Sequence, residues 1–408
     1  AKADMLAKDL GLIPVATSDT HYLTADVVKG ARHGDPYFEE LLLCVQVKKP
    51  ITVPPSQRMS LVHDWDDPHY YHLRTSAEMH EMLGNVAHSI PNSLLVAERC
   101  NARIRTGRTF EMLPDFPLPE DYVVPDGKPE GMDDKIWAQQ SFLRHLVWEG
   151  LHRRYGDPLP AEVVERAEYE LSVINNMGTT SYFLIIWDEV RYAKSIGTVM
   201  GPGRGSGAGS IILYALGVTQ LDPLEHSLLF ERFLNPERIS MPDVDLDHSG
   251  NFDQIREYLS RKYGEDNCAQ IITFQTIGGK SGIRRAAKAI GGDELLPLAN
   301  SMANAFPMKG QVPATIAEAL DPESEHYGVE LNKIISQSEE AKKIIEAAQW
   351  MDGLISAESV HAAAFVVSPF PLTDALPVQL SKDGGNVTAF AMSEAEEVGC
   401  LKLDLLGL

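Results

Sequence analysis

Several stretches of the chain repeat apolar residues with the spacing of one helix face. Residues 76–89 show this spacing, and residues 135–175 show it twice in succession, which predicts amphipathic helices. Residues 182–193 are apolar on most sides and predict a further helix, with Asp188 and Glu189 pointing to solvent. The pattern therefore predicts a layer of helices in the first half of the chain.

Shorter segments have the composition or the alternation of strands. Residues 12–17 form an apolar run that predicts a buried strand, and three later segments have strand patterns: 270–274, 363–368 and 401–405. Residues 276–355 are rich in helical patterns and separate the first two of these later strands, as an insertion would. The order of elements predicts an α/β fold of the α+β kind, in which helices interrupt a sheet.

A change of composition divides the first quarter of the chain from the rest. Residues 106–134 combine acidic residues with five prolines: Pro114, Pro117, Pro119, Pro125 and Pro129. This composition is typical of a linker or of a connection that follows the surface. We therefore place a domain boundary here and treat residues 1–105 as a separate domain.

One predicted strand carries three acidic residues on one face. Side chains alternate along a strand, so Asp243, Asp245 and Asp247 point one way while Val244 and Leu246 point the other. Carboxylates this close repel one another unless cations lie between them, and their hard oxygens suit Mg²⁺. The segment predicts a metal site for phosphoryl chemistry. Asp247 shares the face, but an acid at the end of a strand more often caps a turn.

The last predicted strand, residues 401–405, also places charge on one face, through Lys402 and Asp404. A lone Asp on such a strand is usually an ion-pair partner. With the aspartate strand upstream, Asp404 becomes a candidate third carboxylate, because two Mg²⁺ ions need several shared oxygen ligands. Arg232 could contact phosphate or pair with a nearby acid.

Residues 201–207, Gly-Pro-Gly-Arg-Gly-Ser-Gly, form a glycine-rich turn between a predicted strand at 197–200 and a predicted helix at 208–216. Such a turn can hold phosphate with backbone N–H groups and a helix N-terminus. Arg204 adds a cation and Ser206 a hydroxyl. The spacing fits neither a Walker A loop nor a dinucleotide fingerprint, and a plain tight turn is the alternative.

The formal net charge of −22 argues against a general electrostatic grip on nucleic acid. One basic cluster stands out against it: Lys280, Arg284, Arg285 and Lys288. On a helix, positions 280, 284 and 288 share a face that could follow a phosphate backbone, or be simply solvated. The four cysteines lie far apart, which favours reduced thiols in a cytosol, and neither a signal peptide nor a membrane span is predicted.

Asp19 and His21 directly follow the apolar run at 12–17. Metal-binding side chains often lie at the carboxyl ends of barrel strands, and these two share a face. The motif is short, so a capping Asp beside a core or surface His is the alternative.

Longer motifs resemble those of the bacterial DNA polymerase III alpha subunits, the C family of replicative polymerases. The resemblance rests on GPGRGSGAGS, LDPLEHSLLFERFLNPERISMPDVDLD, QIITFQT and LKLDLLGL, and it extends to SDTHYL, SIPNSLLVAERC and SYFLIIWDEV. It implies that Asp243, Asp245 and Asp404 are catalytic and hold two Mg²⁺ ions. It also implies a nucleotide-binding set made up of Gly203, Arg204, Gly205, Ser206, Lys402 and Arg232.

The same resemblance implies how the domains are arranged. Residues 1–105 would be the end of a barrel-like PHP domain, where Asp19 and His21 match a motif that binds Zn²⁺ or Mn²⁺. Residues 106–274 and 356–408 would form a nucleotidyltransferase palm of the polymerase beta type. Residues 275–355 would form a thumb, with Lys280, Arg284, Arg285 and Lys288 near DNA.

The function implied is template-directed DNA synthesis in the cytoplasm, with primer–template DNA and deoxynucleoside triphosphates as partners. Both ends of the chain look cut, so we expect a piece of a longer polypeptide that is inactive alone. Contacts with a sliding clamp and other replisome subunits would lie in other regions. The alternatives are a template-independent nucleotidyltransferase and a PHP-type phosphoesterase or 3′–5′ exonuclease with the palm as scaffold.

Overall fold

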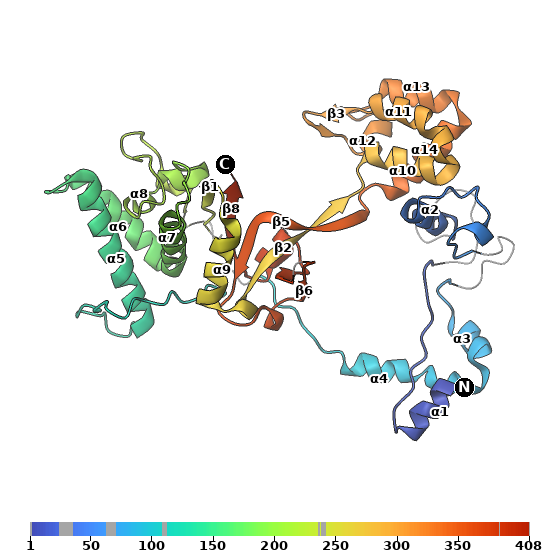
Figure 1. The fold of residues 1–408 in the computed structure, drawn as a ribbon, viewed down its shortest axis with the longest axis horizontal. Coiled ribbons are helices and arrows are strands. Elements are labelled where there is room, and N and C mark those ends of the chain that lie inside the picture. Colours follow the sequence, from blue (N-terminus) through green and yellow to red (C-terminus); the bar gives the residue numbers. More distant parts are fainter. Residues whose placement is uncertain are drawn as a thin grey trace. The chain divides into compact units, whose positions relative to one another are not determined.

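The computed structural model describes most of the chain, in these segments: 2–23, 36–62, 71–107, 112–235, 237, 242–382 and 384–407. The chain divides into two compact units, each built from two separate segments (Figure 1). Unit 1 contains residues 1–102 and 275–357, and unit 2 contains residues 103–274 and 358–408. Unit 2 carries the aspartates and the glycine-rich turn.

A mixed sheet of six strands forms the centre of unit 2, in the order β1-β8-β5-β2-β7-β6. The strands are β1 (Asp245–His248), β2 (Cys268–Thr276), β5 (Ile355–Val367), β6 (Val378–Leu380), β7 (Asn386–Thr388) and β8 (Leu401–Gly407). β1 runs parallel to β8, whereas β8 and β5 are antiparallel. β2 pairs in parallel with β7, and β6 and β7 are antiparallel. The prediction of a mixed α/β fold is confirmed.

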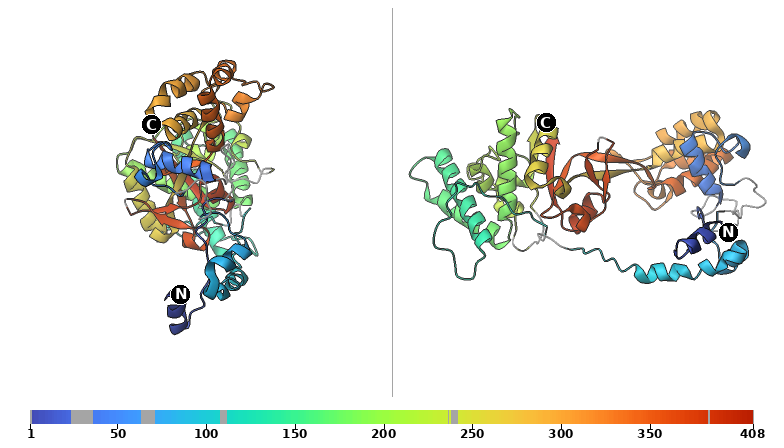
Figure 2. Two further views of the ribbon diagram at one scale, coloured as in Figure 1. Left: turned by 90° about the vertical axis from the view of Figure 1, so that its right-hand side faces the viewer. Right: turned by 60° about the horizontal axis from the view of Figure 1, so that its bottom comes forward.

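Helices lie beside the β1–β8 end of this sheet (Figures 1 and 2). They are α5 (Asp134–Tyr155), α6 (Ala161–Asn176), α7 (Thr180–Ser195), α8 (Ile211–Ala215) and α9 (Phe252–Tyr263), while α15 (Met392–Glu397) precedes β8. The apolar side chains of α7 form the middle of the core, where Phe183 and Ile186 are fully buried. Val244 and Leu246 of the aspartate segment point into the same core. Burial of these apolar faces positions the aspartates on the opposite side.

Unit 1 is mainly helical. It contains the α-helices α1 (Lys2–Asp9), α2 (Pro36–Val47), α3 (Ser76–Leu83), α4 (Asn92–Arg99), α10 (Gly279–Gly291), α11 (Leu296–Asn304), α12 (Ile316–Leu320), α13 (Val329–Gln337) and α14 (Glu339–Met351), together with the short strand pair β3 (Met308–Lys309) and β4 (Val312–Pro313). Ile283 and Ala287 of α10 are fully buried in a core that also includes Leu41 of α2 and Ile344 of α14. The helix-rich insertion predicted at 276–355 is present.

Two predicted strands are absent from the described residues. Residues 12–17 lie outside any strand, and Leu12 and Ile13 are more than half exposed, because no described strand pairs along this segment. Residues 197–200 contain only an isolated bridge between Met200 and His248. An apolar run forms a strand only where neighbouring strands supply its hydrogen bonds.

Other details of the prediction are wrong for identifiable reasons. Asp188 and Glu189 are buried instead of facing solvent, because each has an oppositely charged or hydrogen-bonding partner inside unit 2. At the start of α9, the Asn251 side chain donates to Thr198 Oγ1 at 2.9 Å and does not cap the helix. Among the helices of the described residues, none is long and apolar enough to cross a bilayer.

Candidate active site

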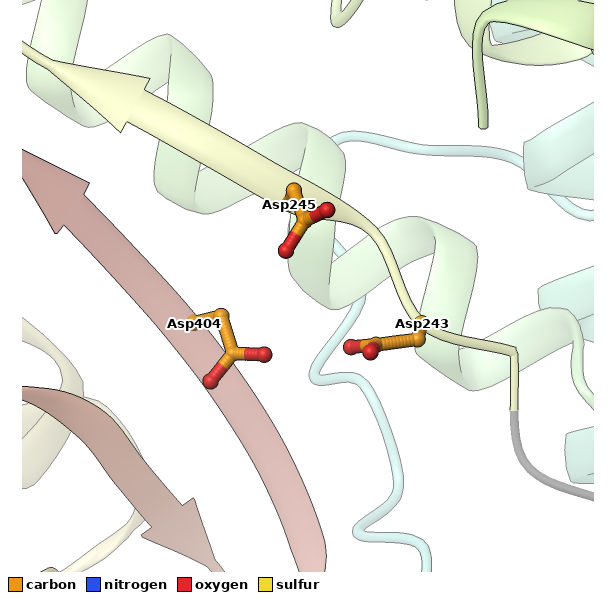
Figure 3. Close-up of side chains that lie close together, drawn as sticks. All are labelled: Asp243, Asp245 and Asp404. Carbon is orange, nitrogen blue, oxygen red and sulfur yellow. The ribbon is translucent and has the colours of Figure 1, made fainter. Parts of the chain in front are cut away.

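Three carboxylates from two distant segments converge in unit 2. Asp245 at the start of β1 lies directly opposite Asp404 of the parallel strand β8, and Asp243 comes two residues earlier on the same face. One oxygen of each carboxylate lies within 4.8 Å of the others. Figure 3 shows the three side chains pointing toward one another. In the described part of the chain, this is the one place where three potential metal ligands meet so closely.

Alternation along both strands explains this convergence. Val244 and Leu246 are buried on either side of Asp245 at the start of β1, and Leu403 and Leu405 are buried on either side of Asp404. Because side chains alternate, burial of these apolar residues turns the carboxylates of both strands to one face.

Lys402 lies among these carboxylates. Its Nζ is 3.0 Å from Asp404 Oδ2, 3.6 Å from Asp243 Oδ1 and 3.4 Å from Glu396 Oε1. Burial alone would lower the pKa of Lys402, but Asp404, Asp243 and Glu396 outweigh burial and raise it. Burial raises the pKa of Asp243, Lys402 opposes this, and Asp404 adds to it. The site is therefore strongly anionic, with one cation held inside it.

The glycine-rich turn lies against the aspartate strand. Gly201 N–H donates to the backbone oxygen of Asp247 at 2.8 Å, and Arg204 Nη1 lies 3.5 Å from Asp247 Oδ1. Arg204 Nε also lies 3.9 Å from Asp245 Oδ2. At Gly205, which has a φ of +62°, an added Cβ would lie 3.1 Å from Asp245 Oδ2. The turn and the carboxylates thus form one continuous site, in which Asp247 contacts Arg204 and lies outside the group of three.

Of the other predicted nucleotide-binding residues, Gly203 and Ser206 lie in this turn, whereas Arg232 lies outside it. Gly203 packs with a φ of +125° against Thr219, so this position favours glycine. Ser206 is exposed in the 3₁₀ turn that begins at Gly205. Arg232 is exposed in a second 3₁₀ turn, and it has neither an ion pair nor a hydrogen bond with another described residue.

Tyr182 supports the site and was not predicted. It is almost fully buried on α7, and its hydroxyl accepts a hydrogen bond of 2.9 Å from the backbone N–H of Val244. Because Val244 stands between Asp243 and Asp245, this bond fixes the backbone that carries both carboxylates. Burial, and then the nearby aspartates, raise the pKa of Tyr182, so its hydroxyl stays protonated. A tyrosine hydroxyl near the start of a mostly apolar helix is its signal in the sequence.

Glu170 on α6 anchors the start of α8, which follows the glycine-rich turn. Its fully buried carboxylate accepts from Ser210 Oγ at 2.7 Å, from the N–H groups of Ile211 and Ile212, and from Arg166 Nε at 2.6 Å. Arg166 also donates to the backbone oxygen of Gly209 at 2.9 Å. Burial raises the pKa of Glu170 against these hydrogen bonds. The spacing of Arg166 and Glu170, four residues apart on a helix, was a signal that sequence analysis could have used.

A buried ionic pair follows the aspartates on β1. His248 Nδ1–H donates to the backbone oxygen of Leu246 at 2.8 Å, and Nε2 lies 2.7 Å from Glu189 Oε1. Beside it, Asp188 accepts from Lys262 Nζ and from Tyr258 Oη, each at 2.6 Å. These contacts tie α7 to β1 and α9.

The predicted DNA-binding cations lie on α10 of unit 1. Arg284 and Lys288 are exposed, while Lys280 and Arg285 are half-buried. Arg284 Nε donates to Asn300 Oδ1 at 2.9 Å, and Lys288 Nζ is 3.9 Å from Asp293 Oδ1. The helical face exists, and its role in DNA binding stays a prediction.

Asp19 and His21 lie together in unit 1. His21 Nε2 is 3.0 Å from Asp19 Oδ1, and both side chains are exposed. Among the described residues, no third metal-binding side chain joins them. Their role as metal ligands stays a prediction.

Comparisons with known proteins agree with the motifs. Residues 141–407 match the family described as the bacterial DNA polymerase III alpha NTPase domain. The chain is 37% identical over 415 residues to the DNA polymerase III subunit alpha of Mycobacterium leprae, and 33% identical over 404 residues to that of Bacillus subtilis. Each alignment covers 99% of this chain and 32% of the relative. It is also 35% identical over 431 residues to the subunit of Aquifex aeolicus, covering 99% of this chain and 34% of the relative. The chain thus spans about a third of the length of the curated relatives that it matches.

Proposed function

Because the chain belongs to the family of bacterial DNA polymerase III alpha subunits, we propose that it carries the nucleotidyl-transfer site of a template-directed DNA polymerase. In this reaction the primer 3′-hydroxyl attacks the α-phosphate of a deoxynucleoside triphosphate, and pyrophosphate leaves. The observation that carries the proposal is the convergence of Asp243, Asp245 and Asp404 beside the glycine-rich turn.

The donor set fits divalent magnesium. All three groups are carboxylates, which are the hard oxygen ligands that Mg²⁺ prefers, and their oxygens lie within 4.8 Å of one another. Asp243, Asp245 and Asp404 would hold the metal. When bound, a pair of such ions activates an attacking hydroxyl and stabilises the charge on phosphate oxygens.

The chain's own residues supply positioning and charge. Arg204 lies within ion-pair distance of Asp245 and is more than half exposed, so it can also reach an anion in front of the turn. The exposed backbone around Gly205 and Ser206 offers N–H donors for phosphate oxygens. Lys402 is held by Asp243 and Asp404, where it would stay charged and next to the reacting groups.

Further roles follow from family membership as part of the same proposal. Unit 2 would be the palm of the nucleotidyltransferase type, the α10–α14 region would be the thumb, and the first hundred residues would end a PHP domain. Lys280, Arg284, Arg285 and Lys288 would contact the primer–template backbone. The protein would work in the cytoplasm with clamp and replisome subunits. The phosphoesterase alternative stays a prediction, because among the described residues no third metal-binding side chain joins Asp19 and His21.

The test is primer extension by the full-length protein with Asp243→Asn. We expect incorporation to fall below about a thousandth of wild type, with the thermal midpoint nearly unchanged, because the carboxylate acts in the reaction and not in the core. Asp253→Asn is the matched control, since Asp253 lies on α9 with a 97% exposed side chain and pairs with Arg256. Near-normal extension by Asp243→Asn would refute the proposal. Extension without template would instead favour a template-independent enzyme.

A further inference from the structure

Unit 2 also contains a group of cationic side chains that lies apart from the carboxylates. A cavity of about 520 Å³ opens between α5, α7 and the segment that follows α8. Leu146, Trp187 and Val190 contribute apolar surface to it. Four cations also line it: Arg153 and Arg154 from the end of α5, and Arg191 and Lys194 from α7. None of the residues that form the carboxylate site lines this cavity.

The positive charge in this cavity is poorly balanced. Lys194 Nζ donates to the backbone oxygen of Gly217 at 2.6 Å, and Arg154 Nη2 donates to the backbone oxygen of Thr219 at 3.2 Å. These carbonyl oxygens satisfy hydrogen bonds but carry no net charge. Burial and then Arg154 lower the pKa of Lys194, as expected when cations crowd together.

Acidic residues offset only part of this charge. Arg191 pairs with Asp188 at 2.8 Å, but Asp188 also accepts from Lys262. Within the described residues, Arg153 has neither an ion pair nor a hydrogen bond, and Glu149 is the only acid among those that line the cavity. A net cationic cavity in a chain of net charge −22 therefore calls for an anionic ligand.

We propose that this cavity binds a polyphosphate, either free or as the phosphate chain of a nucleotide. Its volume lies within the range of small-molecule sites, and a nucleotide-sized ligand would fit. Several cations on two facing helices suit a chain of phosphates better than a single carboxylate, because each phosphate brings its own charge and acceptors. The apolar surface around Trp187 offers a place for a base.

The cavity is connected to the glycine-rich turn by short contacts. Arg154 Nη2 also donates to Gln220 Oε1 at 2.9 Å, and the backbone N–H of Gln220 donates to Pro202 O at 2.7 Å. The side chain of the preceding Thr219 lies 3.3 Å from where a Cβ on Gly203 would be. A ligand that draws Arg154 away from this segment would loosen the support of the turn. A ligand in the cavity would therefore affect the glycine-rich turn through Arg154 and Gln220.

Calorimetric titration of the chain with sodium tripolyphosphate, in EDTA, tests the proposal. Without divalent metal the carboxylate site is anionic, so binding there is suppressed. We expect saturable binding that Arg153→Glu weakens at least tenfold, since a charge-assisted contact is lost and a repulsive charge is added. Arg153 is exposed and has no described partner, so this variant is expected to fold.

Two controls place the binding site. Arg144→Ala removes a cation of the same helix that does not line the cavity, and Asp243→Asn alters the carboxylate site; both should bind tripolyphosphate within twofold of wild type. A second titration with ATP distinguishes a free polyphosphate from a nucleotide as the ligand, because tighter binding of ATP would show that the base contributes. A flat titration up to millimolar tripolyphosphate, or equal affinity of wild type and Arg153→Glu, would overturn the proposal.

Discussion

Replacement of Lys402 by methionine should make the thermal stability of the protein depend on a bound divalent metal ion. Lys402 is the cation held among the carboxylates, 3.0 Å from Asp404 and 3.6 Å from Asp243. Methionine keeps most of the volume of the side chain and removes the charge. Asp404, whose side chain is only 10% exposed, would then face Asp243 and Asp245 without the positive charge of the lysine. A bound cation would relieve the repulsion that the variant creates.

The size of the effect follows from the distances. Coulomb's law at an effective dielectric constant of about 20 gives roughly 5 kcal/mol for the Lys402–Asp404 attraction at 3.0 Å. Desolvation of both groups offsets part of this, and the 60% exposed side chain of Asp243 is screened by water. We therefore expect a loss of about 2–3 kcal/mol in metal-free buffer. For a unit of this size, that lowers the thermal midpoint by roughly 5–10 °C.

The assay is thermal unfolding of wild type and variant in EDTA and in excess Mn²⁺. Metal at about a hundred times its Kd stabilises a protein by about 2.7 kcal/mol, so Mn²⁺ should restore most of the loss in Lys402→Met. Wild type should respond less, because the lysine competes for the same oxygens. Lys262→Met is the matched control: Lys262 is also mostly buried and pairs with Asp188 at 2.6 Å. An equal response of both variants to Mn²⁺ would refute this reasoning.

Three further predictions concern stability. Glu170→Ala should cost about 3–5 kcal/mol in denaturant unfolding, because it leaves the mostly buried guanidinium of Arg166 without its carboxylate partner and several buried donors without an acceptor. Gly150→Ala should cost about 1–3 kcal/mol or more in the same assay, because the added Cβ would lie 2.0 Å from Ala215 O and force α5 and α8 apart. Burial would lower the pKa of His248, but Glu189 outweighs it and raises the pKa. Its contribution is therefore complete below about pH 6.5 and is lost as pH rises through the higher folded-state pKa, so His248→Gln should flatten the fall of the thermal midpoint above neutral pH.

The residues of the candidate site could be predicted from the sequence, because each strand carries them in a local alternating pattern. Alternation around Asp243 and Asp245 predicted which side chains share a face, and the same rule applied to Leu403 and Asp404. In both strands, burial of the apolar residues on one face turns the charged residues to the other face. That the two strands are neighbours was suggested only by the ligand needs of a shared metal site and by the resemblance, since no local pattern specifies strand order.

The buried polar contacts could not be predicted in the same way. Asp188 and Glu189 lie on a helix that is apolar on most sides, and a solvent-facing position is the usual place for such charges. Their partners Lys262 and His248 lie more than fifty residues further along the chain, and such pairing has no periodicity. A charged residue inside an otherwise apolar helix is thus a signal for a buried pair, although it does not identify the partner.

The register of β1 against β8 links the fold to the site. A shift of β8 by one residue would turn Asp404 and Lys402 into the core and expose Leu403, so the apolar pattern excludes it. The register that buries the leucines also places Asp404 opposite Asp245, even though residues 275–357 intervene as part of another unit. Lys402 reaches the same face because it is two residues from Asp404. Hydrophobic burial on one face of the two strands therefore brings three carboxylates together against their repulsion, and it brings the compensating cation with them.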